Sequence, residues 1–307
     1  MQIITFRSKH QAGKATPRVG SLLTDELVLD FTEALKAYHK GPLPPSDLLS
    51  WFDLDKRWLA AVKGVEEAIA QDYQRLGSMS DAVIGRDAVE LLAPVPRPGK
   101  LICVGLNYRD HAAESQMPIP EQPVIFSKFS TAVVGPNQPI VLPGTSEQVD
   151  YEAELAVVIG RRGRHISPES AFDYVLGYTC FNDISARDFQ FADGQWQRGK
   201  SCDTFAPMGP FILTADEVPD PHDLPIKLRL NGKTLQDSTT GQMIFGVPEL
   251  ITFLSETITL EPGDVIATGT PPGVGFARKP PVFLRDGDRV EVEVAGLGVL
   301  ANSVARA

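Results

Sequence analysis

Short apolar segments separated by glycine- and proline-rich turns dominate the chain from residue 101 to residue 307. Such segments predict β-strands, and Asn231-Gly232 between two of them is a strong hairpin-turn signal. The predicted strands cover residues 101–104, 123–126, 140–142, 151–159, 226–230, 265–268 and 289–294. Helical stretches are few, near residues 168–174 and 247–255. This pattern indicates a rolled or sandwiched β-domain.

The first 93 residues have a mixed pattern. Strands are predicted at residues 2–6, 19–23 and 27–31, and polar caps predict helices that start near Thr32 and Ser46. Further along, apolar residues recur at helical spacing: Trp58, Val62, Val65, Ile69 and Leu76. They predict the core-facing side of an amphipathic helix rather than a ligand site. We therefore expect a small α+β unit here.

A proline-rich segment separates the two patterns. Residues 94–100 contain three alternating prolines, which form a stiff, extended connector that no helix or central strand accepts. The expected organisation is therefore a small amino-terminal domain (1–93), a linker (94–100) and a larger domain (101–307).

Composition narrows the class of partner. The chain has 307 residues, a net charge of -10 and 43% hydrophobic residues, a composition typical of globular proteins. The acidic balance argues against nucleic acid or an anionic membrane as a partner, because both require clustered basic residues. No apolar run approaches the roughly 20 residues that cross a bilayer. The start of the chain lacks a signal-peptide pattern, and three scattered cysteines suit a reducing compartment, so we expect a cytoplasmic protein.

An acidic pair gives the first indication of chemistry. Glu152 and Glu154 alternate along a predicted strand, so they project from the same face. Two carboxylates this close repel each other unless a cation or a shared proton lies between them. With Asp183, they would suit a hard cation such as Mg²⁺ or Mn²⁺. An exposed acidic edge strand with solvated glutamates is an equal alternative on spacing alone.

Several motifs, in the same order, resemble the fumarylacetoacetate hydrolase (FAH) family. The matching segments are residues 104–111 (VGLNYRDH), 126–129 (FSKF), 150–155 (DYEAEL), 182–188 (NDISARD), 199–201 (GKS) and 268–275 (TGTPPGVG). The resemblance covers residues 101–307 and is strongest to the branch of FAH-domain-containing proteins with a short amino-terminal domain. It implies an α+β protein whose carboxy-terminal domain is a mostly β, FAH-type rolled β-sandwich.

The resemblance assigns roles to particular residues. It implies that Glu152, Glu154 and Asp183 hold a divalent ion, and that His111 and Glu114 form a base and its orienting carboxylate. Their i, i+3 spacing puts both on one face of a helical turn, although such a pair is often simply solvent-exposed. Members that cleave fumarylacetoacetate carry a further metal-binding Asp at the position of Val104, so fumarylacetoacetate is not the expected substrate.

Five further residues are candidates for contact with the substrate, and two of them, Gln190 and Thr270, match family positions that touch it. Lys200 follows a glycine-bearing loop and could stabilise an oxyanion, unless it is a surface lysine. Lys128 and Arg187 could bind substrate charge, but a structural ion pair with a nearby acid is as good an explanation. Gln190 and Thr270 could contact substrate or could make ordinary loop hydrogen bonds.

The implied function is a divalent-metal-dependent hydrolase that cleaves a C–C bond in 2,4-dioxo acids, such as acylpyruvates or sugar-derived diketo acids. The alternatives are an oxaloacetate decarboxylase or keto–enol tautomerase, which needs the same enolate stabilisation, and a catalytically silent metal-binding module. The expected cofactor is Mg²⁺ or Mn²⁺, with Ca²⁺ as a possible occupant in crystals. The expected partners are a small 2-oxo acid and a second copy of the chain in a homodimer.

Overall fold

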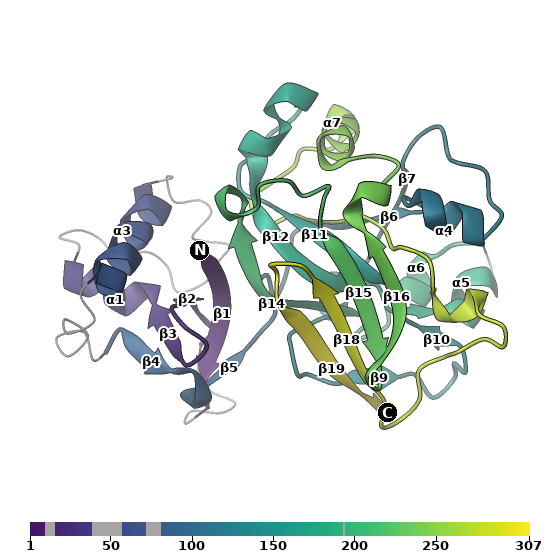
Figure 1. The fold of residues 1–307 in the computed structure, drawn as a ribbon, viewed down its shortest axis with the longest axis horizontal. Helices are drawn as coiled ribbons and strands as arrows, with labels where there is room; N and C mark the ends of the chain where they lie inside the picture. Colours follow the sequence, from purple (N-terminus) through teal and green to yellow (C-terminus); the bar gives the residue numbers. More distant parts are fainter. Residues whose placement is uncertain (10–15, 39–56, 72–80, 193) are drawn as a thin grey trace.

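Two β-sheets form the framework of the protein (Figure 1). The computed structural model describes residues 1–9, 16–38, 57–71, 81–192 and 194–307. Within these residues the larger sheet has twelve strands. Its main path runs β4 (Val83–Gly85), β3 (Leu27–Asp30), β2 (Arg18–Leu22), β1 (Gln2–Ser8), β14 (Ala206–Thr214), β12 (Val175–Asn182), β11 (Ala153–Ile159), β17 (Val265–Ala267), β6 (Leu101–Gly105) and β7 (Val124–Ser127). Beside this path, β5 (Val89–Leu91) pairs with β1, and β8 (Val133–Val134) pairs with β14.

A five-stranded sheet packs on the middle of the larger one (Figure 1). Its order is β16 (Lys233–Thr239), β15 (Pro225–Leu230), β18 (Arg289–Val294), β19 (Val299–Arg306) and β9 (Ile140–Leu142). Apolar residues alternate with polar ones along β15 and β18, and the apolar set is buried against β11 and β12. The result is the mostly β, sandwich-like fold that the sequence predicts.

The strand β11 lies between β12 and β17 and is buried along its whole length. Its sequence, AELAVVI, is an apolar run interrupted only by Glu154. A continuous apolar run is what a strand covered on both faces requires. Because a carboxylate in such a strand must be balanced locally, the start of β11 is where chemistry is expected.

Short helices connect the strands. They are α1 (Phe31–Tyr38), α3 (Arg57–Gln71), α4 (Arg109–Glu114), α5 (Arg187–Ala192), α6 (Gln197–Lys200) and α7 (Val247–Thr257). The 3₁₀ turns are η3 (Arg86–Ala88), η4 (Ser130–Ala132), η5 (Pro168–Tyr174), η6 (Ala215–Glu217), η7 (Thr240–Gln242) and η8 (Gly275–Ala277). Helix α7 buries Val247, Leu250, Ile251 and Leu254, which is the i, i+3, i+4, i+7 spacing of an amphipathic helix.

The amino-terminal elements follow the sequence pattern. A helix begins beside Thr32, and in α3 the side chains of Val62, Val65 and Ile69 are buried as predicted. The helix start at Ser46 and the position of Leu76 lie outside the described residues. Strand β1 pairs with β14, so the two parts of the chain share one sheet (Figure 1). The domain boundary at residues 94–100 stays a prediction.

Two predicted elements differ from the structure. Residues 168–174 form 3₁₀ turns rather than an α-helix, and residues 151 and 152 lie before the strand β11 instead of inside it. The two-residue strand β10 (Val149–Asp150) precedes that gap and pairs with another two-residue strand, β13 (Ser185–Ala186). The Asn231-Gly232 turn does connect β15 and β16, with positive φ at both residues, as a two-residue hairpin loop requires.

Asn107 ties three segments together under the site. Its Nδ2 donates to the carbonyl oxygens of Phe245 and Thr268 at 3.0 and 2.8 Å, and its Oδ1 accepts from Phe245 N–H at 2.9 Å. Asn107 is fully buried, so Asn107→Ala leaves these backbone groups unpaired. We expect it to lower the free energy of unfolding by about 2–5 kcal/mol in urea denaturation. Gln122→Ala at an exposed position is the control, and an equally small change in both variants would contradict the expectation.

Candidate active site

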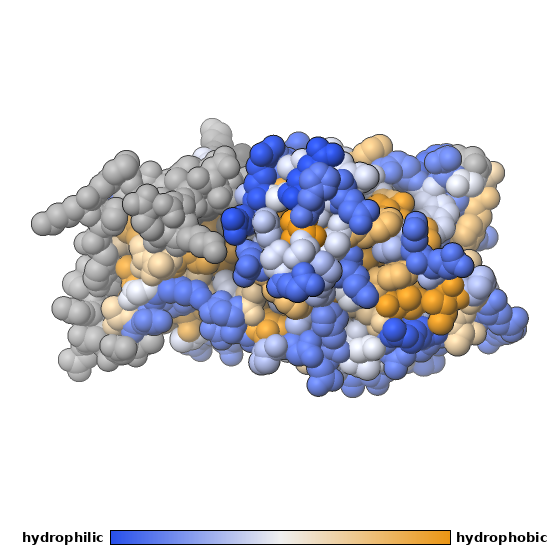
Figure 2. Space-filling model, turned by 90° about the horizontal axis from the view of Figure 1, so that it is seen from above, coloured by the Kyte–Doolittle hydropathy of each residue, from blue (hydrophilic) through white to orange (hydrophobic). Residues whose placement is uncertain are grey.

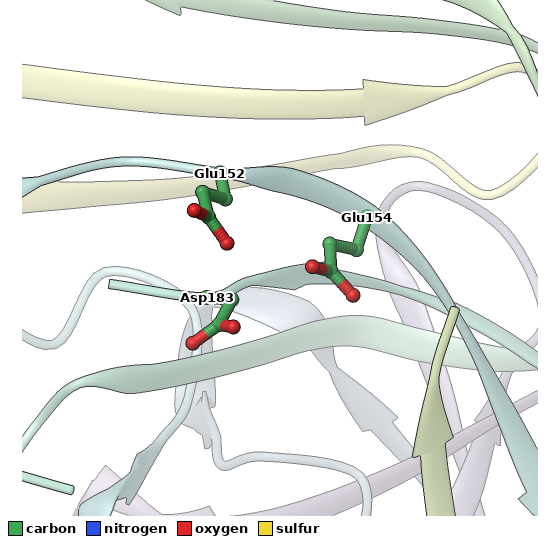
Figure 3. A group of neighbouring side chains, drawn as sticks. All are labelled: Glu152, Glu154 and Asp183. Carbon is green, nitrogen blue, oxygen red and sulfur yellow. The ribbon is translucent and has the colours of Figure 1, made fainter. Parts of the chain in front are cut away.

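Three buried carboxylates point into one space between β11 and β12 (Figure 3). Glu154 lies on β11, Glu152 directly precedes that strand and Asp183 directly follows β12. One oxygen atom from each carboxylate lies within 4.8 Å of one oxygen atom from each of the other two. The antiparallel register pairs Ala153 with Asn182, and Asp183 N–H donates to the carbonyl oxygen of Glu152 at 2.9 Å, so the ends of the two strands bring the acids together.

Two lysines neutralise part of this cluster. Lys200 Nζ lies 2.8 Å from Glu152 Oε2 and 2.7 Å from Asp183 Oδ2. Lys128 Nζ bonds to the other oxygen of Asp183 and donates to the carbonyl oxygen of Ile184 at 2.9 Å. The side chain of Lys128 is fully buried, which matches the structural ion pair that the sequence left open for it.

Lys200 ends the short helix α6 and does not follow a loop as the sequence suggests. Gly199 before it allows α6 to approach α5 closely, because a Cβ there would lie 2.6 Å from Gln190 N and 2.7 Å from the carbonyl oxygen of Ala186. This close approach places the Lys200 ammonium group at the bottom of the site, where its side chain is 2% exposed.

Arg187 also forms a buried ion-pair network. Its Nη2 lies 2.6 Å from Glu152 Oε1, its Nε donates to Asp150 Oδ2 at 2.9 Å, and its Nη1 donates to Gln190 Oε1 at 2.9 Å. The guanidinium group stacks over the ring of Phe276, 4.4 Å from the ring centroid. Asp150 is a member of this network for which the sequence predicted no role, although it opens the matching motif 150–155.

Among the described residues, no cation forms an ion pair with Glu154, unlike the other acids of the cluster. The donor to its side chain, among the described residues, is Gly269 N–H at 2.8 Å. Gly269 has φ +101°, and a Cβ there would lie 2.8 Å from the Cβ of Asn107, so a glycine is required. Burial, together with the charges of Asp183 and Glu152, raises the pKa of Glu154 well above its usual range.

The pKa values of Glu152 and Lys200, which pair with opposite charges, shift so that both groups stay ionised. Burial raises the pKa of Glu152, but Lys200 and Arg187 outweigh it and hold this pKa below its usual value. Burial lowers the pKa of Lys200, but Asp183 and Glu152 outweigh it and raise this pKa. The network therefore has four carboxylates against three cations: Asp150, Glu152, Glu154 and Asp183 against Lys128, Arg187 and Lys200. If all four acids are ionised, one negative charge is left over, and Glu154 is the acid that no described cation contacts.

The donor set fits a divalent metal ion. Glu152, Glu154 and Asp183 offer only oxygen atoms, which hard cations such as Mg²⁺, Mn²⁺ and Ca²⁺ prefer. A divalent ion would relieve the repulsion at Glu154 and change the net charge of the network from -1 to +1. The same change would make the site attractive to an anionic substrate.

His111 and Glu114 lie together on α4, as their spacing predicts. His111 Nδ1 lies 3.3 Å from Glu114 Oε2. Both oxygens of Glu114 accept from Gly273 N–H at 3.1 Å. Burial raises the pKa of Glu114, but the hydrogen bonds from His111 and Gly273 lower it overall. If Nδ1 donates to Glu114, Nε2 of the imidazole is free to exchange a proton with a bound molecule.

A pocket of about 480 Å³ brings most of these residues together. Its wall includes eight of the ten predicted site residues: His111, Glu114, Glu152, Glu154, Arg187, Gln190, Lys200 and Thr270. Asp183 lies below them, whereas Lys128 lines a separate hollow beside the edge strand β7. Phe126, Trp196, Phe191 and Phe276 form an aromatic part of the wall that the sequence did not predict.

Gln190 and Thr270 already make hydrogen bonds inside the protein. Gln190 accepts from Arg187, and Thr270 Oγ1 donates to the carbonyl oxygen of Ala153 at 2.9 Å. Gln236, which the sequence did not indicate, donates to Thr270 Oγ1 at 2.9 Å. Both predicted residues therefore stiffen the wall of the pocket whether or not they contact substrate.

The protein is similar to proteins of known family. The model of the fumarylacetoacetate (FAA) hydrolase C-terminal family matches residues 100–305. Oxaloacetate tautomerase fahd2, mitochondrial, from Xenopus laevis is 42% identical over 307 residues, which cover 99% of this chain and 90% of the relative. Oxaloacetate tautomerase FAHD2A, mitochondrial, from Bos taurus is 53% identical over 224 residues, 72% of this chain and 71% of the relative.

The fold is also similar to those of solved structures. Fumarylacetoacetate hydrolase from Exiguobacterium antarcticum superposes with a TM-score of 0.79 at 35% identity, covering all of both chains. A 5-carboxymethyl-2-hydroxymuconate delta-isomerase from Mycobacterium smegmatis gives a TM-score of 0.74 at 34% identity, again over all of both chains.

The expectation of a cytoplasmic protein is wrong. The relatives from Bos taurus and Xenopus laevis are named mitochondrial, which points to mitochondria instead. The sequence pattern could not separate the cytoplasm from mitochondria, because signal-peptide patterns concern only the secretory route and free thiols suit either reducing compartment. Within the described residues, none of the helices combines the length and apolar character that a membrane span requires.

Proposed function

Because the chain belongs to the fumarylacetoacetate hydrolase family, we propose that it is a divalent-metal-dependent enzyme that interconverts the keto and enol forms of oxaloacetate. The observation that carries the proposal is the relative named oxaloacetate tautomerase, which is 42% identical over 99% of this chain. The pocket supports it, since it combines an acidic metal-type cluster with a histidine that can move a proton.

The reaction moves one proton between carbon and oxygen. In the keto-to-enol direction, His111 Nε2 removes a proton from C3, while Glu114 holds the ring at 3.3 Å. The electron pair forms the C2–C3 double bond, and the C2 oxygen becomes negative. Lys200 uses two of its three ammonium protons for Glu152 and Asp183, and the third can donate to that oxygen. The proton on His111 then returns through solvent to the oxygen.

Glu152, Glu154 and Asp183 would hold the metal ion, for which Mg²⁺ or Mn²⁺ is the proposed identity. When bound, it would supply positive charge that lowers the energy of the enolate. Arg187 keeps Glu152 in place by pairing with its Oε1 at 2.6 Å, and is proposed to act on substrate only through this contact.

Ketonisation of enol-oxaloacetate, followed by ultraviolet absorbance with Mg²⁺ present, tests the proposal. We expect His111→Gln to lower the rate by about 100-fold or more, because it removes the group that transfers the proton. His165→Asn is the matched control: His165 is exposed, and asparagine tolerates its positive φ of 53°. Wild-type protein that binds Mg²⁺ but leaves the ketonisation rate at the uncatalysed value would refute the tautomerase.

C–C bond hydrolysis is the second candidate, favoured by the His111–Glu114 pair, which could equally activate water. Pyruvate release from acylpyruvates, measured with lactate dehydrogenase, distinguishes it from tautomerisation. The same coupled assay with oxaloacetate detects decarboxylation. Faster pyruvate release than ketonisation would favour either of these reactions, and metal binding without any turnover would favour a silent module. The proposed homodimer can be tested by light scattering on the eluting protein.

A further inference from the structure

Lys279 stands at the wall of the pocket without a partner. It is exposed, lines the 480 Å³ pocket and makes no hydrogen bond or ion pair with any residue in the described part of the chain. The arginine and the other lysine in this wall, Arg187 and Lys200, are both bound to carboxylates. Lys279 is therefore the pocket cation whose charge is still available to a bound molecule.

The backbone before Lys279 is held in place. Asp150 accepts from Gly275 N–H at 2.7 Å and from Phe276 N–H at 3.1 Å, and Arg278 Nε donates to the carbonyl oxygen of Gly273 at 3.1 Å. Asp150 also binds Arg187, so the segment that carries Lys279 is tied to the acidic cluster. Lys279 is thus a flexible side chain on an anchored base, which suits the capture of a group near the pocket mouth.

The other described residues near Lys279 at the pocket opening are aromatic or apolar. Phe191 and Phe276 pack edge to face with ring centroids 6.0 Å apart, and Trp196 packs on Phe126 at 5.3 Å. Met117 and Phe191 are 54% and 59% exposed. Figure 2 shows apolar surface between hydrophilic residues at this end of the molecule. A carboxylate entering this region would lose water among aromatic rings, and Lys279 is the described wall cation that could compensate it.

We propose that Lys279 binds the distal carboxylate of the substrate and so selects dicarboxylic over monocarboxylic 2-oxo acids. The inference rests on the proposed function in one respect: the 2-oxo-carboxylate end of the substrate lies at the acidic cluster. Oxaloacetate then has a second carboxylate, on C4, that the network around Glu154 does not neutralise. Lys279 supplies the missing positive charge for that carboxylate.

The test compares two four-carbon substrates that differ only in the distal carboxylate, oxaloacetate and 2-oxobutyrate. We expect Lys279→Met to raise KM for oxaloacetate about 10-fold, the loss of one charge-assisted contact, with kcat nearly unchanged. Exchange of the C3 protons of 2-oxobutyrate in deuterated water should stay the same. Lys279→Arg should retain most of the affinity, and Lys233→Met, at an exposed position outside the pocket, is the matched control.

Binding measurements test the role of Lys279 independently of the proposed tautomerase activity. Calorimetry on Mg²⁺-loaded His111→Gln protein should show tighter binding of oxaloacetate than of 2-oxobutyrate. Adding Lys279→Met should remove this difference. If the difference persists, the role of Lys279 is refuted, even where wild-type protein is an active tautomerase. If wild-type protein is inactive but the difference depends on Lys279, the tautomerase is refuted and the carboxylate site stands.

Discussion

Glu154→Gln is expected to abolish metal binding while leaving the metal-free protein as stable as the wild type, or more stable. Glu154 is buried beside Asp183 and Glu152, and one backbone N–H faces it where the other two acids have cations. Its raised pKa means that ionised Glu154 is costly without a cation. A neutral amide of the same shape removes that cost, but it also removes a charged ligand from the cluster. We expect metal affinity to fall by more than roughly 100-fold, since removing a group that only hydrogen-bonds to a metal ligand already costs about 10–100-fold.

Two measurements check this pair of effects. Isothermal titration with Mg²⁺ or Mn²⁺ gives the affinity, and the melting temperature of chelator-treated protein gives the stability. Glu256→Gln, at an exposed helix position, is the matched control and should change neither. Glu152→Gln should differ from both, because it leaves Lys200 and Arg187 with an unpaired charge and lowers the stability of the metal-free protein. A Glu154→Gln protein that still binds metal at wild-type affinity would remove Glu154 from the ligand set.

Local patterns in the sequence predicted the elements on which the site is built. The alternation in residues 289–294 and 226–230 corresponds to strands with one buried face, and Asn231-Gly232 forms the turn between β15 and β16. The i, i+3 spacing of His111 and Glu114 places both on α4, within contact distance. These features depend on neighbours a few residues away, which is why a single sequence suffices to predict them.

Local sequence patterns did not predict which distant segments pair with each other. Asp183 meets Glu152 because β11 and β12 are antiparallel neighbours, and no spacing rule within one strand indicates this. Glu152 even lies outside the strand on which its predicted orientation depended. The resemblance to a family supplied this pairing, whereas physical reasoning from the residues left an exposed acidic strand as an equal alternative.

The roles of the basic residues also depend on contacts between distant segments, which the sequence alone does not show. Lys128 and Arg187 could have bound either substrate or protein acids, and only their surroundings decide between these roles. Both are buried in ion pairs, and Asp150 links Arg187 to the backbone of Gly275. The sequence does not identify Lys279 as a site residue, because a single lysine before a proline forms no recognisable motif.

Lys200→Met is expected to destabilise the metal-free protein and to make its stability depend on a divalent ion. Lys200 joins Glu152 and Asp183 at 2.8 and 2.7 Å, and its side chain is 2% exposed. Removing one partner of such a buried network costs about 3–5 kcal/mol, because the carboxylates keep their charge without compensation. We expect the melting temperature of chelator-treated protein to fall by roughly 5–15 °C.

A divalent ion should restore much of this loss, because it supplies to the same carboxylates the charge that the lysine no longer provides. The rise in melting temperature on adding Mg²⁺ should therefore be larger in Lys200→Met than in the wild type, whereas Lys233→Met should match the wild type. Ketonisation of enol-oxaloacetate should stay reduced by about 100-fold even in the stabilised, metal-loaded variant, since the proposed donor to the C2 oxygen is absent. Full activity on reloading would show that Lys200 only balances charge. An unchanged melting temperature without metal would mean that the buried carboxylates do not depend on Lys200 for their stability.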